Sequence, residues 1–258
     1  MKPAQIAIQF YTLRKQCATV EDFASTCRKV REIGYEAVQI SGVDRQVIPE
    51  AQIAQICADH GLNICATHED AKEILEAPLK VVERLLALGT KLTAYPYPSG
   101  IDFSSETAVA EFISKLNQSG QILAENGMVL AYHNHHHEFR QLGGRLILDR
   151  IYEDTEPTAL QAELDTYWVQ YGGGDSAAWC RKLTGRLPMI HLKDFRINDE
   201  SQIEFSEVGQ GNLDMPAIIR AAEESGCRWF IVEQDTCPGD PFDSIRLSYD
   251  HLRGLAEF

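Results

Sequence analysis

Residues 131–139 read AYHNHHHEF and place four histidines and one glutamate within a few positions of each other. Imidazole and carboxylate groups at this density are suited to binding a divalent cation or to moving protons. The segment alone leaves three interpretations open: a metal site, a catalytic base with its helpers, or a solvated polar loop. The choice depends on which other reactive side chains the fold brings beside it.

Other reactive side chains also follow apolar runs of the chain. His68, Asp165, His191 and Glu233 each stand at or near the end of such a run, and Glu138 follows the histidine-rich one. Polar groups in these places are costly unless they are paired. A divalent cation is the simplest common partner for two or three carboxylates and one imidazole.

The elements that must position these groups are short strands that alternate with amphipathic helices. Eight runs read as strands, and most of them follow a helical stretch, several of which end in glycine: residues 6–11, 36–41, 63–68, 91–96, 128–135, 160–165, 188–194 and 229–235. Eight strand–helix units predict a single (β/α)8 TIM barrel over residues 1–258, with reactive groups at the carboxyl ends of the strands. An open, doubly wound sheet is the alternative. It is disfavoured because no G-x-G-x-x-G turn follows the first strand.

Strand periodicity tests whether the reactive groups can meet. Side chains point alternately into and out of a barrel, so Asp165 lies on the same face as Glu163, and His191 on the same face as Lys193. Asp165, His191 and Glu233 can therefore point inward together. The polar segment of residues 195–215 follows the seventh strand, and we expect it to form a loop over one end of the barrel.

The overall composition limits the possible partners. The net charge is −14, which would repel the phosphates of nucleic acids and the surface of an anionic membrane. We see no run that resembles a signal peptide or a membrane span, and seven cysteines without a C-x-x-C pair are expected to be reduced thiols. We therefore expect a cytoplasmic protein with a small-molecule partner, and the composition is compatible with either a monomer or a homo-oligomer.

The motifs ELDTYW, IHLKD, EVGQGNLD and IVEQD together resemble the sugar phosphate isomerase/epimerase family, which has the xylose isomerase-like TIM barrel. The resemblance covers nearly the whole chain. It implies one divalent metal ion (Mn, Mg, Co or Zn) held by Glu, Asp, His and Glu. Asp165, His191 and Glu233 match three of these ligands. The fifth strand contains no glutamate, so Glu138 is the expected fourth ligand, with His133 or His135 as alternatives.

The resemblance also implies a reaction. The expected function is a metal-dependent sugar isomerase or epimerase that acts through a metal-stabilised enediolate, with Glu138 and Glu233 as the acid/base groups. One alternative is a dehydratase of a keto-polyol such as an inosose, and another is a non-catalytic sugar-binding barrel. His136 and His137 are expected to pack or to face solvent. The residues expected to bind substrate are His68, His135, Lys193, Trp168 and Glu207.

Overall fold

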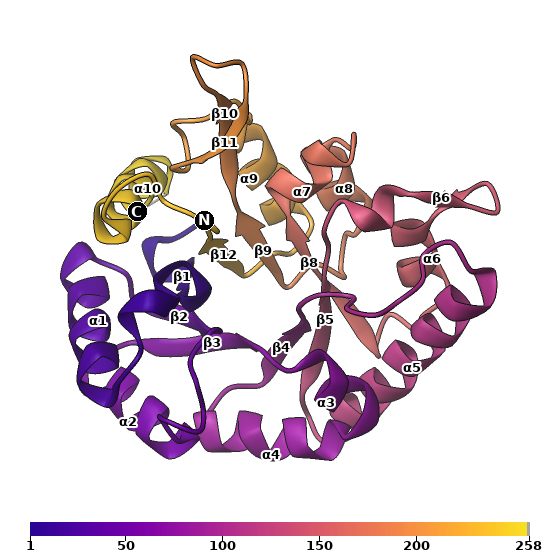
Figure 1. The fold of residues 1–258 in the computed structure, drawn as a ribbon, viewed down its shortest axis with the longest axis horizontal. Helices are drawn as coiled ribbons and strands as arrows, with labels where there is room; N and C mark the ends of the chain where they lie inside the picture. The colour runs from indigo at the N-terminus through magenta and orange to yellow at the C-terminus, as the bar shows by residue number, and fades with distance from the viewer. Residues whose placement is uncertain (257–258) are drawn as a thin grey trace.

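The computed structural model describes residues 1–256, which contain a closed barrel of eight parallel strands surrounded by helices (Figure 1). The barrel order is β1-β12-β9-β8-β5-β4-β3-β2. The barrel strands are β1 (Ile6–Gln9), β2 (Ala37–Ile40), β3 (Asn63–His68), β4 (Leu92–Tyr95), β5 (Val129–His133), β8 (Leu160–Asp165), β9 (Met189–Leu192) and β12 (Trp229–Val232). The predicted TIM barrel is confirmed. The prediction of one domain over residues 1–258 stays a prediction, and residues 257–258 lie outside the described part.

The helices form the outer ring, which closes where the last long helix packs against the first (Figure 1). Amphipathic sequences cover the barrel because one stripe of each helix is apolar. The α-helices are α1 (Val20–Ile33), α2 (Glu50–Asp59), α3 (Ala71–Glu76), α4 (Pro78–Leu88), α5 (Glu106–Glu125), α6 (Ile147–Glu153), α7 (Thr166–Tyr171), α8 (Ser176–Lys182), α9 (Met215–Glu224) and α10 (Pro241–Leu255). The 3-10 helices are η1 (Pro3–Gln5), η2 (Phe10–Gln16) and η3 (His137–Phe139).

Glycine ends several helices where the sequence predicts it. Gly89 follows α4 with a φ of 72°, a left-handed conformation that a side chain would disfavour. The chain then enters β4. Among residues 1–256, no helix has both the length and the hydropathy that a membrane span needs.

The segment after β9 is the polar excursion that the sequence predicts over one end of the barrel. It contains an antiparallel pair, β10 (Asp194–Ile197) and β11 (Ile203–Ser206), and a second small pair, β6 (Gln141–Leu142) with β7 (Arg145–Leu146), lies elsewhere on the rim. Asp194 holds in place the loop that follows β11. Its carboxylate accepts backbone N–H groups of Phe195, Gly209, Gly211 and Leu213 over 2.9–3.3 Å. These bonds fix the loop beside the barrel mouth.

Candidate metal and substrate site

The register of three neighbouring strands brings the reactive groups together. His133 of β5 pairs with Glu163 of β8, and Asp165 of β8 pairs with His191 of β9. Residues that pair in a parallel sheet face the same side, and all four of these side chains are buried. The barrel interior therefore holds a polar layer at the carboxyl ends of its strands. Glu233, the residue after β12, joins this layer.

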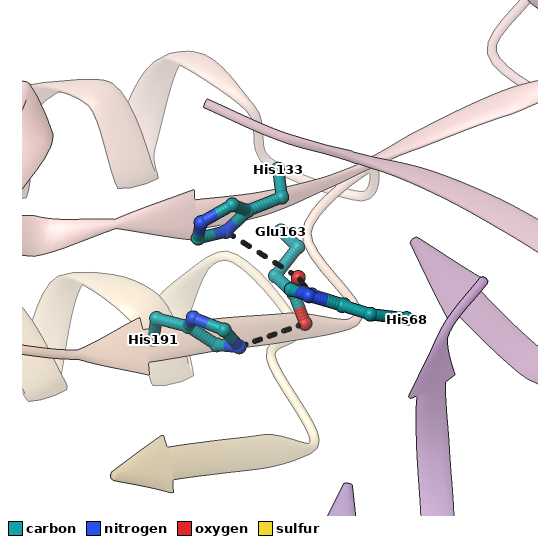
Figure 2. A group of neighbouring side chains, drawn as sticks. All are labelled: His68, His133, Glu163 and His191. Carbon is teal, nitrogen blue, oxygen red and sulfur yellow. Dashed lines mark hydrogen bonds and ion pairs between the residues drawn. The ribbon is translucent and has the colours of Figure 1, made fainter. Parts of the chain in front are cut away.

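Glu163 lies among three histidines in the barrel interior (Figure 2). Its Oε1 atom accepts a hydrogen bond of 2.6 Å from Gln39 and lies 3.2 Å from His191 Nε2. Its Oε2 atom lies 2.5 Å from His68 Nε2. Gln39 Oε1 in turn lies 2.7 Å from His191 Nε2 and accepts a bond from Gln9. Glu163 thus fixes the orientation of two imidazole rings.

Four buried side chains form a group of the described residues that could hold a metal ion: His133, Asp165, His191 and Glu233. We call these four residues the quartet. Each offers one ligand atom, and the four atoms lie within 4.8 Å of one another. A second group of the same kind, His68, His133, Glu163 and His191, overlaps it. The quartet is the better candidate because Glu163 already has its own hydrogen-bond partners.

Two buried atoms without a hydrogen bond support a cation at the quartet. His133 Nδ1 and Asp165 Oδ2 have no hydrogen-bond partner among the described residues, and their nearest charged groups are longer contacts, Glu163 at 3.4 Å and Lys193 at 3.6 Å. Such buried polar atoms are costly unless a water or an ion satisfies them. His191 turns its Nε2 atom toward Gln39 and its Nδ1 atom toward Glu233, at 3.0 Å. Gln39 would hold Nε2 of a ligating His191, as a hydrogen-bond partner usually holds the second nitrogen of such a histidine, and Nδ1 would be the ligand atom, on the side of Glu233.

Burial and close ion pairs set the charges of the site. Burial raises the pKa of Asp165 to about 7; the positive charge of Lys193 opposes this shift, and the negative charge of Glu233 contributes to it. Burial also holds the pKa of His133 well below its usual value, so this ring is neutral. Burial alone would raise the pKa of Glu233, but the positive charges of Lys193 and His191 hold that pKa well below its usual value. Lys193 and His191 thus supply the positive charge that faces these carboxylates.

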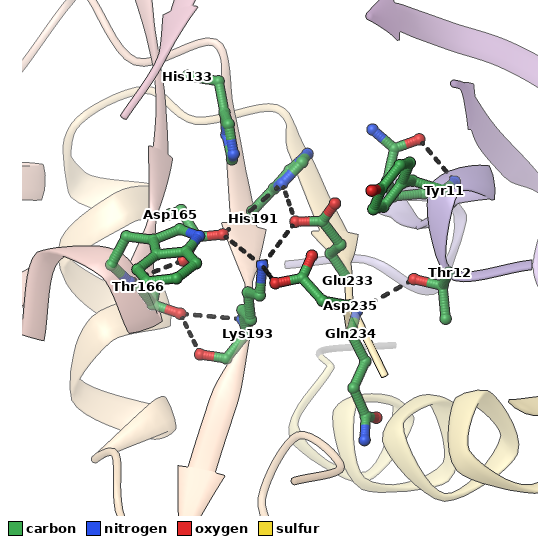
Figure 3. A network of polar contacts seen from close by, with 12 residues as sticks. Tyr11, Thr12, His133, Asp165, Thr166, His191, Lys193, Glu233, Gln234 and Asp235 are labelled. Atoms are coloured by element: carbon green, nitrogen blue, oxygen red, sulfur yellow. Dashed lines mark hydrogen bonds and ion pairs between the residues drawn. The ribbon is translucent and has the colours of Figure 1, made fainter. Parts of the chain in front are cut away.

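Lys193 lies among three carboxylates, one residue beyond β9 (Figure 3). Its Nζ atom is 2.7 Å from Asp235 and 3.3 Å from Glu233. A longer contact of 3.6 Å joins it to Asp165. Burial would lower the pKa of Lys193, but the carboxylates around it raise the pKa above its usual value, so the side chain is charged. The ammonium group also lies 5.2 Å from the centre of the Trp168 ring.

A cavity of about 440 Å³ opens above the quartet, and we call it the inner pocket. Four of the five residues expected to bind substrate line it: His68, His135, Lys193 and Trp168. Glu207 does not line it. Its carboxylate instead accepts a hydrogen bond of 2.7 Å from Ser244. The long loop therefore turns this carboxylate toward α10, and the expectation that Glu207 reaches the substrate needs correction.

Glu138 also lies elsewhere than the sequence suggests. Its side chain is buried, with Oε1 accepting a bond of 2.6 Å from the Tyr132 hydroxyl and Oε2 accepting one of 2.9 Å from the His135 backbone N–H. It belongs to neither metal-binding group of the described residues. The reason is local: the chain turns into η3 directly after His136, and the turn folds Glu138 back under the loop. The fourth member of the quartet is His133, which was one of the alternatives to Glu138.

Sequence patterns alone assign no site role to Glu163, Gln39 or Asp235. A signal for Glu163 existed, because strand periodicity puts it on the same face as Asp165. No comparable signal existed for Gln39. Its contact with Glu163 crosses the barrel from β2 to β8, and only the closed fold brings the two together.

We expect Glu138→Gln to leave metal binding intact and to change the pH dependence of stability. Burial raises the pKa of Glu138 to about 7 in the folded chain, from a usual value of 4.5. The folded state therefore disfavours the ionised carboxyl group. The free energy of unfolding of the natural protein should fall by about 3 kcal/mol as the pH rises from about 4 to about 8 through this group.

The glutamine variant should lack this fall. It should be less stable than the natural protein near pH 5, because the amide cannot accept both the Tyr132 and the His135 bonds, and the difference should shrink or reverse near pH 8. Chemical denaturation at both pH values measures the difference in stability between the two proteins. Elemental analysis measures the bound metal. A glutamine variant that loses its metal would show that Glu138 is a ligand after all.

Comparison with known proteins gives the family. A family model described as the xylose isomerase-like TIM barrel matches residues 27–255. The chain belongs to the xylose isomerase-like TIM barrel family. Among solved structures, this family member resembles a sugar phosphate isomerase/epimerase from Parabacteroides distasonis, with a TM-score of 0.84 and 20% identity over 100% of this chain and 96% of the other.

Two other proteins are also similar to this xylose isomerase-like barrel. A xylose isomerase-like TIM barrel protein from Mycobacterium smegmatis, solved in complex with magnesium, has a TM-score of 0.77 and 13% identity over 99% of this chain and 98% of the other. An inosose dehydratase from Geobacillus thermodenitrificans is 28% identical over 158 residues, which are 55% of this chain and 52% of that protein. The chain spans about half the length of the curated relatives it matches. The two structural likenesses show the fold alone.

Proposed function

We propose that the chain is a divalent-metal-dependent isomerase or epimerase that moves a proton at the carbon beside a sugar carbonyl. The observation that carries the proposal is the quartet: His133 Nδ1 and Asp165 Oδ2 lack hydrogen bonds among the described residues, and two of its members, His133 and Glu233, line the inner pocket. The family supports it, because the structural relatives include a sugar phosphate isomerase/epimerase. The substrate we propose is a small sugar.

In this proposal the quartet holds one divalent cation. Two carboxylates and two imidazoles suit several such ions, including Mn, Mg, Co and Zn, and a structural relative was solved with magnesium. When bound, the ion stabilises the negative charge that develops on the oxygens of an enediolate.

The protein side chains move the proton. Glu233 lines one wall of the inner pocket, and Lys193 keeps it ionised, so it can accept a proton from the substrate. His68 lines the pocket from β3, three strands away around the barrel. Its Nε2 atom is held by Glu163 at 2.5 Å, which leaves Nδ1 to donate or accept a proton. Two such groups on different walls are what an epimerase needs. The adjacent Trp168 ring supplies an apolar surface for the sugar.

Proton exchange with solvent tests this function. We expect the metal-loaded protein in D₂O to exchange the proton beside the carbonyl of at least one member of a keto-sugar and inosose panel. Chelation should stop the exchange, and added metal should restore it. His68→Gln should slow the exchange by about 100-fold or more, since acid–base groups contribute about that much. His251→Gln, which alters a histidine of α10, is the matched control. A loaded protein that binds the sugars without any exchange would be a non-catalytic binding protein.

A dehydratase acting on a keto-polyol is the second candidate. The inosose dehydratase relative favours it, and the reaction would begin with the same proton removal. The two candidates differ in their products. An isomerase or epimerase gives a product of unchanged mass, whereas a dehydratase gives a product lighter by one water that absorbs in the ultraviolet as a conjugated carbonyl. Mass spectrometry of the same reactions separates them.

A further inference from the structure

A second and larger cavity adjoins the inner pocket at the barrel mouth. It measures about 730 Å³, and we call it the outer cavity. It lies over the ends of β4, β5 and β8, where the loops that follow these strands meet. Three side chains, Tyr97, His136 and His137, border both spaces. Tyr97 is 46% exposed, so the rim between the two spaces is open to solvent.

Aromatic side chains run without a break from one space to the other. Trp168, which lines the inner pocket, has its ring centre 5.1 Å from that of His136. The His136 ring centre lies 5.1 Å from that of Tyr171, which lines the outer cavity. A ligand seated over Trp168 therefore has a continuous aromatic surface along which to extend outward.

The lining of the outer cavity combines flat apolar surfaces with hydrogen-bonding groups. Tyr171 is 52% exposed, and Ile101, Phe103 and Phe139 supply further apolar area. Polar groups stand among them: Arg140 has five N–H donors, and the Tyr97 hydroxyl lies 3.2 Å from His137 Nε2. A sugar ring has an apolar C–H face and a rim of hydroxyl groups, so it matches this combination better than a purely apolar group does.

We propose that the outer cavity binds a second sugar ring, so that the substrate is a disaccharide-sized glycoside. This inference rests on the proposed function, because the reacting ring occupies the inner pocket above the quartet. The volumes support it, since the inner pocket of about 440 Å³ has room for one ring and the outer cavity of about 730 Å³ has room for another. The glycosidic bond would cross the rim formed by Tyr97, His136 and His137.

Calorimetric binding to the metal-loaded protein tests the proposal. The one-ring probe is methyl β-D-glucoside, and the two-ring probes are cellobiose and maltose. We expect the better two-ring probe to bind at least about tenfold more tightly than the one-ring probe, because the added ring stacks on Tyr171. Tyr171→Ala should remove most of that gain and change the affinity for methyl β-D-glucoside by no more than about twofold. Tyr171→Phe keeps the ring and should keep the gain.

Leu86→Ala is the control for loss of a large exposed side chain, because Leu86 is 64% exposed on α4. It should leave all affinities unchanged. The proposal is overturned if a second ring adds no affinity, if neither kind of probe binds, or if Tyr171→Ala weakens one-ring and two-ring probes equally. If the protein exchanges the protons of keto-sugars but binds two-ring probes no more tightly than the one-ring probe, this inference alone is rejected. If it binds two-ring probes more tightly but exchanges no proton, the proposed function alone is rejected.

Discussion

Asp165→Asn should lower the affinity for the divalent cation by at least about 100-fold and abolish detectable proton exchange. Loss of a residue that merely supports a ligand typically costs about 10- to 100-fold in metal affinity, so loss of a ligand should cost no less. In this structure the two carboxylate oxygens of Asp165 have different roles, so the substitution can remove one role and keep the other. Asp165 Oδ1 accepts the Trp168 backbone N–H at 2.9 Å and caps α7, while Oδ2 accepts no hydrogen bond and lies 3.6 Å from Lys193 Nζ. Asparagine keeps the capping oxygen and puts an N–H donor where the cation needs an acceptor.

Asp175→Asn is the matched control. Asp175 caps α8 in the same way, with its carboxylate accepting the Ala178 N–H at 2.8 Å, but it is more exposed and lies outside both metal-binding groups of the described residues. Its variant should keep full metal occupancy. Elemental analysis and competition with a chelator measure occupancy and affinity, and thermal unfolding shows whether the fold survives. If Asp165→Asn binds metal as tightly as Asp175→Asn, the quartet is not the site.

Glu163→Gln is expected to have the second largest effect. The carboxylate accepts a bond from Gln39 with one oxygen and faces His68 with the other, so an amide must turn a donor toward one of them. The substitution also removes one of the two negative charges that raise the pKa of His191 to about 10 against the lowering effect of burial. We expect a loss of about 3 kcal/mol in the free energy of unfolding, the usual cost of breaking a buried charged group's pairing. Metal affinity should fall by about 10- to 100-fold, because His191 loses its orienting partner.

Glu153→Gln is the comparison for Glu163. Glu153 forms an exposed ion pair of 2.7 Å with Arg145, and exposed pairs contribute about 1 kcal/mol or less. Denaturation curves and chelator competition on both variants give the contrast. Unchanged stability and metal affinity in Glu163→Gln would show that the interior hydrogen bonds of this carboxylate do not support the site.

The fold and three members of the quartet can be predicted from local sequence patterns. Eight β-rich runs alternate with amphipathic helices, and that order predicts a closed barrel without further information. Strand periodicity also predicts that Asp165, His191 and Glu233 face inward, because each lies within or directly after a regular strand. The structure brings their ligand atoms together with that of His133.

The rest of the site depends on turns and on contacts between residues that lie far apart in the sequence, which local sequence patterns do not predict. Glu138 follows the strand by five residues, and the direction of its side chain depends on the turn at η3, where strand periodicity no longer applies. The Tyr132 hydroxyl, buried and in need of an acceptor, then binds its carboxylate. Gln39 reaches Glu163 from the far side of the barrel, 124 positions away in the sequence. Glu207 turns to Ser244 because the Asp194 anchor sets the path of its loop.

The most direct measurement is anomalous diffraction from crystals of the protein soaked with Mn²⁺. It locates the ion without reference to any reaction, and so it tests the quartet on its own. We expect one strong anomalous peak bordered by His133, Asp165, His191 and Glu233, and we expect Glu138 to remain hydrogen-bonded to Tyr132. A peak held by Glu138, a peak at Glu163 and His68 that leaves Asp165 and Glu233 unbound, or no peak at the end of the barrel would contradict it.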